Sequence, residues 1–196
     1  MEQNTITKNL VAWSALMTAL AGVIHLWIIP EHWAHAPAHG LFFLVVGIAQ
    51  IIWGIVLWRR PSTRLYYIGV LMAGWLIVLY GITRWLPVPF GHGPEGIDII
   101  SLVCKLCEAL GMVTLGILIV QGLLLNAGRF VAWRAITLII LVSFIAAFAT
   151  YGVARAAEPI FPSLSAPEEE HHHDEGAPEE HQHDKSMSTP EHELEH

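Results

Sequence analysis

The chain has 196 residues, of which 54% are hydrophobic and only 14% are charged. A soluble domain carries about 25% charged residues, so the composition excludes an ordinary soluble protein and indicates a membrane protein. Residues 1–155 hold nine Lys and Arg against five Asp and Glu, whereas residues 156–196 hold one Lys against twelve Asp and Glu. The few basic residues form no patch, which argues against nucleic-acid binding.

Five segments are long and apolar enough to cross a bilayer, for which a helix needs about 20 residues. They are 10–29, 41–58, 66–86, 97–125 and 131–153. The second is short, but Pro37 suits a first helical turn and allows the helix to begin there. Turns rich in Pro and Gly separate the segments. The sequence therefore predicts an all-α membrane protein, with residues 1–156 forming one domain, a bundle of five transmembrane helices.

The distribution of Lys and Arg over the short loops predicts the orientation, because cytoplasmic loops carry an excess of these residues. One set of loops contains Lys8, Arg59, Arg60, Arg64, Arg129 and Arg134, and loops 30–40 and 87–96 contain none. We expect a cytoplasmic N-terminus in the plasma or inner membrane, and five spans then put the C-terminal tail outside the cytoplasm. Arg155, just beyond the last span, is the one basic residue against this orientation.

The tail, residues 157–196, is acidic and rich in histidine, and it has too little apolar surface to form a core. We expect it to be disordered. Its histidines stand in clusters among Asp and Glu, and such tracts bind transition metals weakly. The candidate ligands in the tail are His171, His172, His173, His181 and His183.

The predicted topology places all twelve histidines in the outer half of the membrane or beyond it. Neutral imidazole is a common ligand of transition metals, and spacings of three or four residues put two rings on one helical face. The candidate ligands of an outer metal site are His25, Glu31, His32, His35, His39 and His92. The alternative is that these side chains only bind water and lipid headgroups at the interface.

Polar side chains inside the spans indicate a second feature, because ionisable groups are costly within a bilayer. They form a stripe on the fourth span and continue on the second and third, which suggests a polar path for an ion. The residues of this path are Gln50, Arg84, Asp98, Ser101, Cys104, Lys105, Cys107 and Glu108. The stripe could equally hold the bundle together, and for Cys104 and Cys107 we favour packing as small apolar residues over metal ligation.

These features together favour a protein that binds a divalent transition-metal ion (Cu, Zn, Ni or Co) and transports it, or handles it for a transporter. The alternative is a haem- or cofactor-binding subunit of a membrane redox complex, with axial histidines such as His25 and His39. An enzyme is less favoured, because the sequence offers no clear set of base and nucleophile. The expected partners are the lipid bilayer, the ion, and other membrane subunits or a second copy of the chain.

Overall fold

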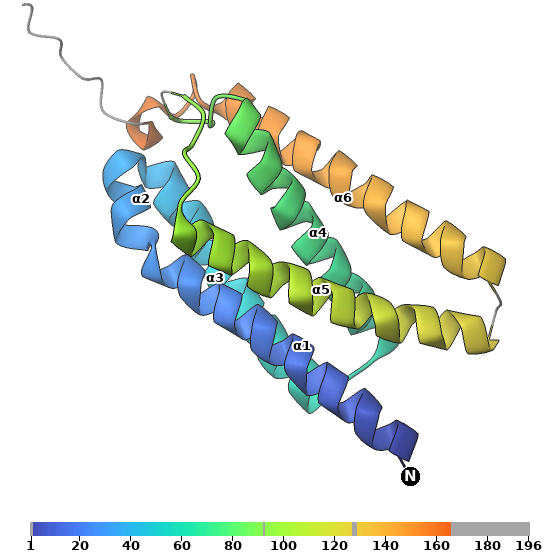
Figure 1. The fold of residues 1–196 in the computed structure, drawn as a ribbon. Helices are drawn as coiled ribbons and strands as arrows, with labels where there is room; N and C mark the ends of the chain where they lie inside the picture. The colour runs from blue at the N-terminus through green and yellow to red at the C-terminus, as the bar shows by residue number, and fades with distance from the viewer. Residues whose placement is uncertain (1, 92, 127–128, 166–196) are drawn as a thin grey trace, which may run out of the picture.

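The computed structural model describes residues 2–91, 93–126 and 129–165. Its long helices are α1 (Glu2–Trp27), α3 (Pro37–Arg59), α4 (Thr63–Trp85), α5 (Ile99–Asn126) and α6 (Arg129–Ala157). A short helix α2 (Ile29–His35) and a 3-10 turn η1 (Pro162–Leu164) complete the elements (Figure 1). Each of the five long helices contains a stretch long and apolar enough to cross a membrane. The predicted all-α bundle with five candidate spans is confirmed.

The largest difference from the sequence analysis lies between the first two spans, where we expected a loop. Residues 29–35 form the additional helix α2. Pro30 does not simply end α1. It lies in the first turn of α2, where its missing N–H and fixed φ are tolerated. Pro37 likewise stands in the first turn of α3, so the second span begins earlier than the apolar run at residue 41.

The order of the helices in space differs from their order in the chain. Helix α1 packs against α3 and α5, and α4 packs against α5 and α6. Helix α6 rests mainly on α4, and only 11% of its spanning stretch is buried. As Figure 1 shows, α1 and α5 lie side by side, although 71 residues separate the end of α1 from the start of α5. Side chains from distant parts of the sequence therefore share one interior.

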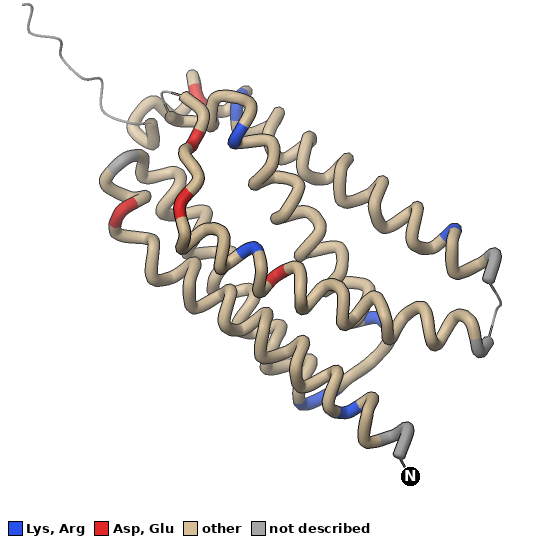
Figure 2. Tube along the Cα trace, viewed as in Figure 1, with Lys and Arg blue, Asp and Glu red and all other residues tan. Residues whose placement is uncertain are grey.

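The two ends of the bundle differ in charge. In Figure 2, the coloured acidic residues lie toward the end that carries α2, the 86–98 connection and η1. The opposite end holds the start of α1 and the 60–62 turn, where Lys8, Arg59, Arg60 and Arg64 lie. Apolar side chains fill the interior on this basic side, including Val11, Trp53, Leu57, Leu115 and Ile119. The buried polar side chains of His25, Gln50 and Glu108 form a connected group closer to α2 than this apolar cluster.

Glycines allow α1 and α3 to approach very closely. A Cβ atom added at Gly47 would lie 2.8 Å from the carbonyl oxygen of Gly22 and 2.7 Å from a methyl carbon of Leu26. One added at Gly54 would lie 2.9 Å from the carbonyl oxygen of Ala15. Helices in lipid associate through such contacts between small residues. The close crossing brings the C-terminal half of α1 against the middle of α3.

We expect Gly47→Ala to destabilise the bundle by about 1–3 kcal/mol, because the new methyl group would overpack the crossing of α1 and α3. Thermal unfolding of the detergent-solubilised protein measures this. Gly116→Ala is the matched control, because a Cβ atom there would meet nothing within 4 Å and alanine is the better helix former. Equal effects of the two substitutions would contradict the close crossing.

Candidate metal centre

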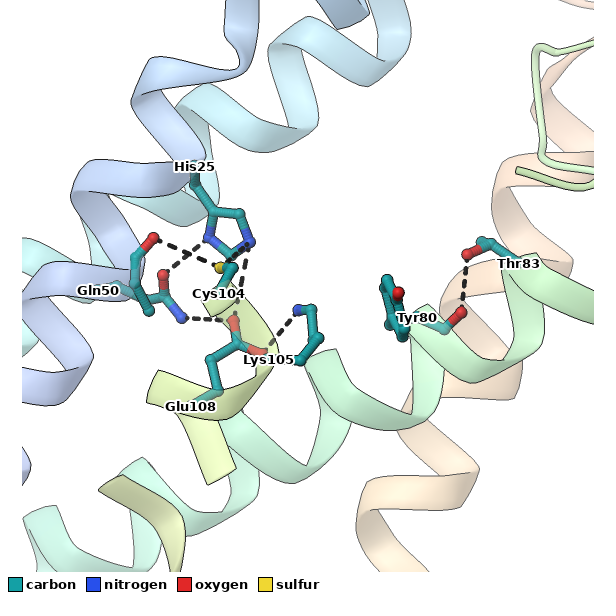
Figure 3. A network of polar contacts seen from close by, with 8 residues as sticks. His25, Gln50, Tyr80, Thr83, Cys104, Lys105 and Glu108 are labelled. Carbon is teal, nitrogen blue, oxygen red and sulfur yellow. Dashed lines mark hydrogen bonds and ion pairs between the residues drawn. The ribbon is translucent and has the colours of Figure 1, made fainter. Parts of the chain in front are cut away.

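Three side chains that commonly bind metals converge in the half of the bundle that carries α2. They are His25 on α1 and Cys104 and Glu108 on α5, and they are 2%, 1% and 1% exposed. His25 Nε2 lies 3.4 Å from Cys104 Sγ and 3.7 Å from Glu108 Oε1. One ligand atom of each residue lies within 4.8 Å of the other two. We call these residues the triad; they point toward one another in Figure 3.

Contacts along α1 and α5 fix the register that forms the triad. The Ser14 hydroxyl donates to the Gly111 carbonyl over 3.1 Å. Gly111 leaves room for Thr18, whose hydroxyl oxygen would lie 3.2 Å from an added Cβ atom. The Cys104 thiol lies 3.7 Å from the Ala21 carbonyl, toward which it donates. Residues 14, 18, 21 and 25 recur at helical spacing, so one face of α1 follows α5 over several turns.

Gln50 on α3 orients the imidazole of His25. Its amide nitrogen donates to Glu108 Oε1 over 3.0 Å, and its amide oxygen lies 2.8 Å from His25 Nδ1. A carboxylate only accepts hydrogen bonds, so the amide nitrogen of Gln50 must face Glu108 and its oxygen must face His25. Nδ1 therefore carries the proton in the neutral ring. The lone pair on Nε2 then faces Cys104 and Glu108, as a metal ligand would require.

Lys105 neutralises the buried carboxylate of Glu108. Its ammonium group donates to Glu108 Oε2 over 2.6 Å, and it also lies 5.6 Å from the centre of the Tyr80 ring. A buried charge is tolerated when it is paired and its remaining hydrogen-bonding capacity is used. Both oxygens of Glu108 meet this condition, one with Lys105 and the other with Gln50.

Two adjoining cavities lie near the triad. The inner cavity contacts the triad, and the outer cavity lies closer to α2. The inner one has a volume of about 180 Å³ and is largely apolar, with His25, Cys104 and Lys105 in its wall. The outer one, about 910 Å³, is lined near α2 and the 88–101 segment by acidic groups and histidines, namely Glu31, His32, His39, Glu95 and Asp98. The residues that line both cavities are Ile28, His39, Val88, Glu95 and Ser101.

The loop that separates the cavities is held in an unusual backbone conformation. Phe90 has a positive φ of 63°, a region that residues other than glycine seldom adopt. Its side chain is buried and lines the inner cavity. The turn is closed by a hydrogen bond from the Val88 amide to the Gly93 carbonyl over 3.1 Å. Phe90 therefore forms part of the inner cavity's wall.

The histidines near α2 bind to protein groups outside the triad. His32 Nδ1 donates to the Ile28 carbonyl over 3.0 Å, and its Nε2 lies 3.4 Å from Glu95 Oε1. His39 Nε2 donates to the Pro89 carbonyl over 2.7 Å. In the described residues, His32 and His39 are therefore not part of the triad. His25 belongs to an inner site, His32 lines the outer cavity, and His39 lines both cavities.

The other candidate residues fall in different places. Asp98 caps α5, because its Oδ1 accepts from the Ser101 amide over 2.8 Å. Arg84 donates to Glu95 Oε2 over 2.8 Å. Glu31 is exposed on the outer cavity. The side chain of His35 is not among those that the structure describes, and outside the described residues lie His92, His171, His172, His173, His181 and His183.

The two cysteines differ in their surroundings. Cys107 is buried against Met17, Ala21 and Ile24, which fits the expected packing role. Cys104 belongs to the same apolar cluster, but its sulfur also faces the imidazole of His25. A thiol, a neutral imidazole and a carboxylate together form a donor set for transition metals. The sequence analysis included all three residues but did not place them in one site.

Glu95 forms ion pairs beside the two cavities, and the sequence analysis did not single it out. It joins α2 to the end of α4, because it lies between His32 and Arg84. The available signal was that Glu95 is the one charged residue in the Pro- and Gly-rich stretch 87–96. An acid in an otherwise uncharged loop is a candidate partner for nearby basic groups.

The ion pairs of Glu95 shift the pKa values of His32 and of Glu95 itself. Burial alone would lower the pKa of His32, but Glu95 and the Ile28 carbonyl stabilise the imidazolium and raise it above the usual 6.5. Burial alone would raise the pKa of Glu95, but His32 and Arg84 lower it below the usual 4.5. The contact of His32 with Glu95 therefore stabilises the fold fully between pH 4.5 and pH 6.5, and it is lost as the pH falls through the lowered pKa of Glu95. It is also lost as the pH rises through the raised pKa of His32.

No family model, curated protein or solved structure matches this chain.

We expect the pKa of His32 to lie above 6.5 and to fall in Glu95→Gln, because that substitution removes the charge that stabilises the imidazolium. Titration of the histidine resonances by NMR measures it, with a His32→Gln variant used to assign the signal. Glu158→Gln is the control, because Glu158 pairs with Arg155 instead. A pKa of His32 that is unaffected by Glu95→Gln would show that the ion pair does not form.

Proposed function

We propose that this chain binds a transition-metal ion at His25, Cys104 and Glu108 and moves it across the membrane, alone or for a transporter. The observation that carries the proposal is the convergence of three buried ligand atoms within 4.8 Å, with the lone pair of the imidazole directed at the other two. Ionisable groups within membrane-spanning helices often mark the pathway of an ion.

The outer cavity supports a route to this site. Two acidic side chains in its wall, Glu31 and Asp98, would raise the local concentration of cations. From there, an ion would pass the shared wall of the two cavities near His39 and Ser101 and reach Cys104. The proposed intramembrane path thus combines the polar stripe of α5 with Gln50 and Arg84 from α3 and α4.

We propose that the tail, residues 157–196, collects metal ions. In the proposed orientation, the N-terminus is cytoplasmic and the tail begins outside the cytoplasm, at the end of the bundle where η1 packs against α3. Its histidine clusters would gather ions and pass them to the outer cavity. The tail would bind metals weakly, whereas the triad would bind tightly because its ligands are already positioned.

The described residues do not favour haem. A pair of axial ligands would require the free nitrogens of two histidines to face one open space. His39 donates Nε2–H to the Pro89 carbonyl, which leaves only its Nδ1 as a ligand atom, whereas the free nitrogen of His25, Nε2, faces two side chains of α5. The metal ion is therefore the better-supported ligand.

We expect His25→Ala and Cys104→Ser each to lose one tightly bound ion per chain, because each removes a ligand from the triad. Metal analysis of the full-length protein, purified without oxygen and washed with a mild chelator, measures this. Cys107→Ser is the matched control and should keep the ion, since Cys107 packs away from the ligand atoms. The tail is present in all variants, so its contribution cancels. Full retention in both ligand variants would contradict the proposed site.

The proposed orientation predicts opposite accessibility of two exposed serines. Ser62 stands in the turn between α3 and α4, and Ser163 in η1 at the other end of the bundle. In a Cys104→Ser, Cys107→Ser background, a membrane-impermeant thiol reagent applied to intact cells should label Ser163→Cys and leave Ser62→Cys unlabelled. Permeabilised cells control for reactivity. The reverse pattern would invert the topology and place the outer cavity in the cytoplasm.

A further inference from the structure

The charges around the triad carry an inference about which class of ion it takes, and this inference rests on the proposed function. We infer that the site selects a soft monovalent ion of the Cu(I) type over divalent ions, because Lys105 is built into it. The composition of the tail does not indicate such a preference for a monovalent ion.

Without an ion, the charges at the site balance. Glu108 contributes one negative charge and Lys105 one positive charge, joined by a contact of 2.6 Å. The imidazole of His25 and the thiol of Cys104 are neutral. Arg84 and Glu95 line the inner cavity and are joined by their own contact of 2.8 Å, so this pair offers no spare charge. Asp98 lies at the start of α5, where its carboxylate caps the helix.

Binding of a monovalent ion preserves this balance. The S–H bond of Cys104 breaks, a metal–sulfur bond forms, and the proton leaves to bulk water. The ion and Lys105 are then balanced by the thiolate and Glu108. A divalent ion bound by the same exchange would leave one net positive charge. That charge would stand next to the inner cavity, whose walls are largely apolar, and burying an unpaired charge is strongly unfavourable.

The geometry keeps Lys105 beside the ion. Glu108 offers one oxygen to Lys105 and the other, Oε1, toward His25 and Cys104, so the ammonium and the ion share one carboxylate. The ammonium is also attracted by the face of the Tyr80 ring. No second carboxylate belongs to the triad in the described part of the chain. Thiolate and imidazole are ligands that suit soft ions.

Silver(I) and cobalt(II) are suitable probes, because Ag(I) is soft, monovalent and needs no reductant, and Co(II) is divalent. Each gives a sulfur-to-metal absorption band when a thiolate binds it. The chain has only two cysteines, so the tail cannot contribute to this band. We expect the full-length wild type to show the silver–thiolate band and no cobalt–thiolate band. The silver band should persist in Cys107→Ser and disappear in Cys104→Ser.

Removal of the positive charge should change this preference. In Lys105→Gln, a divalent ion becomes the balanced one, so the cobalt–thiolate band should appear. The affinity for Co(II) relative to Ag(I) should rise by about tenfold or more, since a unit charge a few ångströms away acts twice as strongly on a divalent ion. Gln50→Glu adds a negative charge at the same place and should shift the preference in the same direction. If Lys105→Gln does not fold, Gln50→Glu tests whether the charge at the site sets the preference.

Two negative results have different meanings. If neither ion gives a thiolate band in the wild type, the triad binds no metal and the proposed function itself fails. If the wild type binds Co(II) through Cys104 and neither Lys105→Gln nor Gln50→Glu raises the relative affinity for Co(II), the site exists but its charge does not select the ion. The second result overturns only the inference.

Discussion

A carboxylate in the apolar interior of a membrane bundle must have both its charge and its lone pairs satisfied by neighbouring groups. Glu108 is such a carboxylate, and three helices meet around it. Its own helix α5 supplies Lys105, and α3 supplies the amide of Gln50. Gln50 in turn binds His25 on α1. Loss of the carboxylate would leave an ammonium and an amide without their partners, so the orientation of all three helices depends on it.

The glycine contacts between α1 and α3 are the packing counterpart of this network. Hydrogen bonds of 2.8–3.0 Å between His25, Gln50 and Glu108 require that the backbones approach closely. Gly22 and Gly47 permit this, because any larger side chain there would meet the facing backbone. Helix α6 takes no part in the network and is mostly exposed toward the surroundings. The bundle thus has a tightly packed group of α1, α3 and α5, joined through α4 to a peripheral helix.

The separation of the histidines into two groups follows from local hydrogen bonding. His32 and His39 lie near backbone carbonyls, each of which takes a ring N–H, and Glu95 draws His32 toward the 86–98 connection. His25 lies deeper, and its partners are side chains of other helices. His32 and His39 therefore line the outer cavity together with acidic side chains, while the inner histidine keeps one nitrogen directed at a sulfur and a carboxylate.

The sequence by itself determined the five apolar helices, because a run of about 20 apolar residues has no other stable form in a bilayer. It also identified the polar stripe of α5 from its helical spacing. The tertiary structure decided which stripes meet. The order of helices in space differs from the chain order, so neither the pairing of His25 with Cys104 nor the different surroundings of Cys104 and Cys107 follows from spacing. Helix α2 was missed because Pro30 suits both the end of one helix and the first turn of the next. Contacts between distant helices depend on crossing angle and rotation, which small residues such as Gly47 set only once the helices pack.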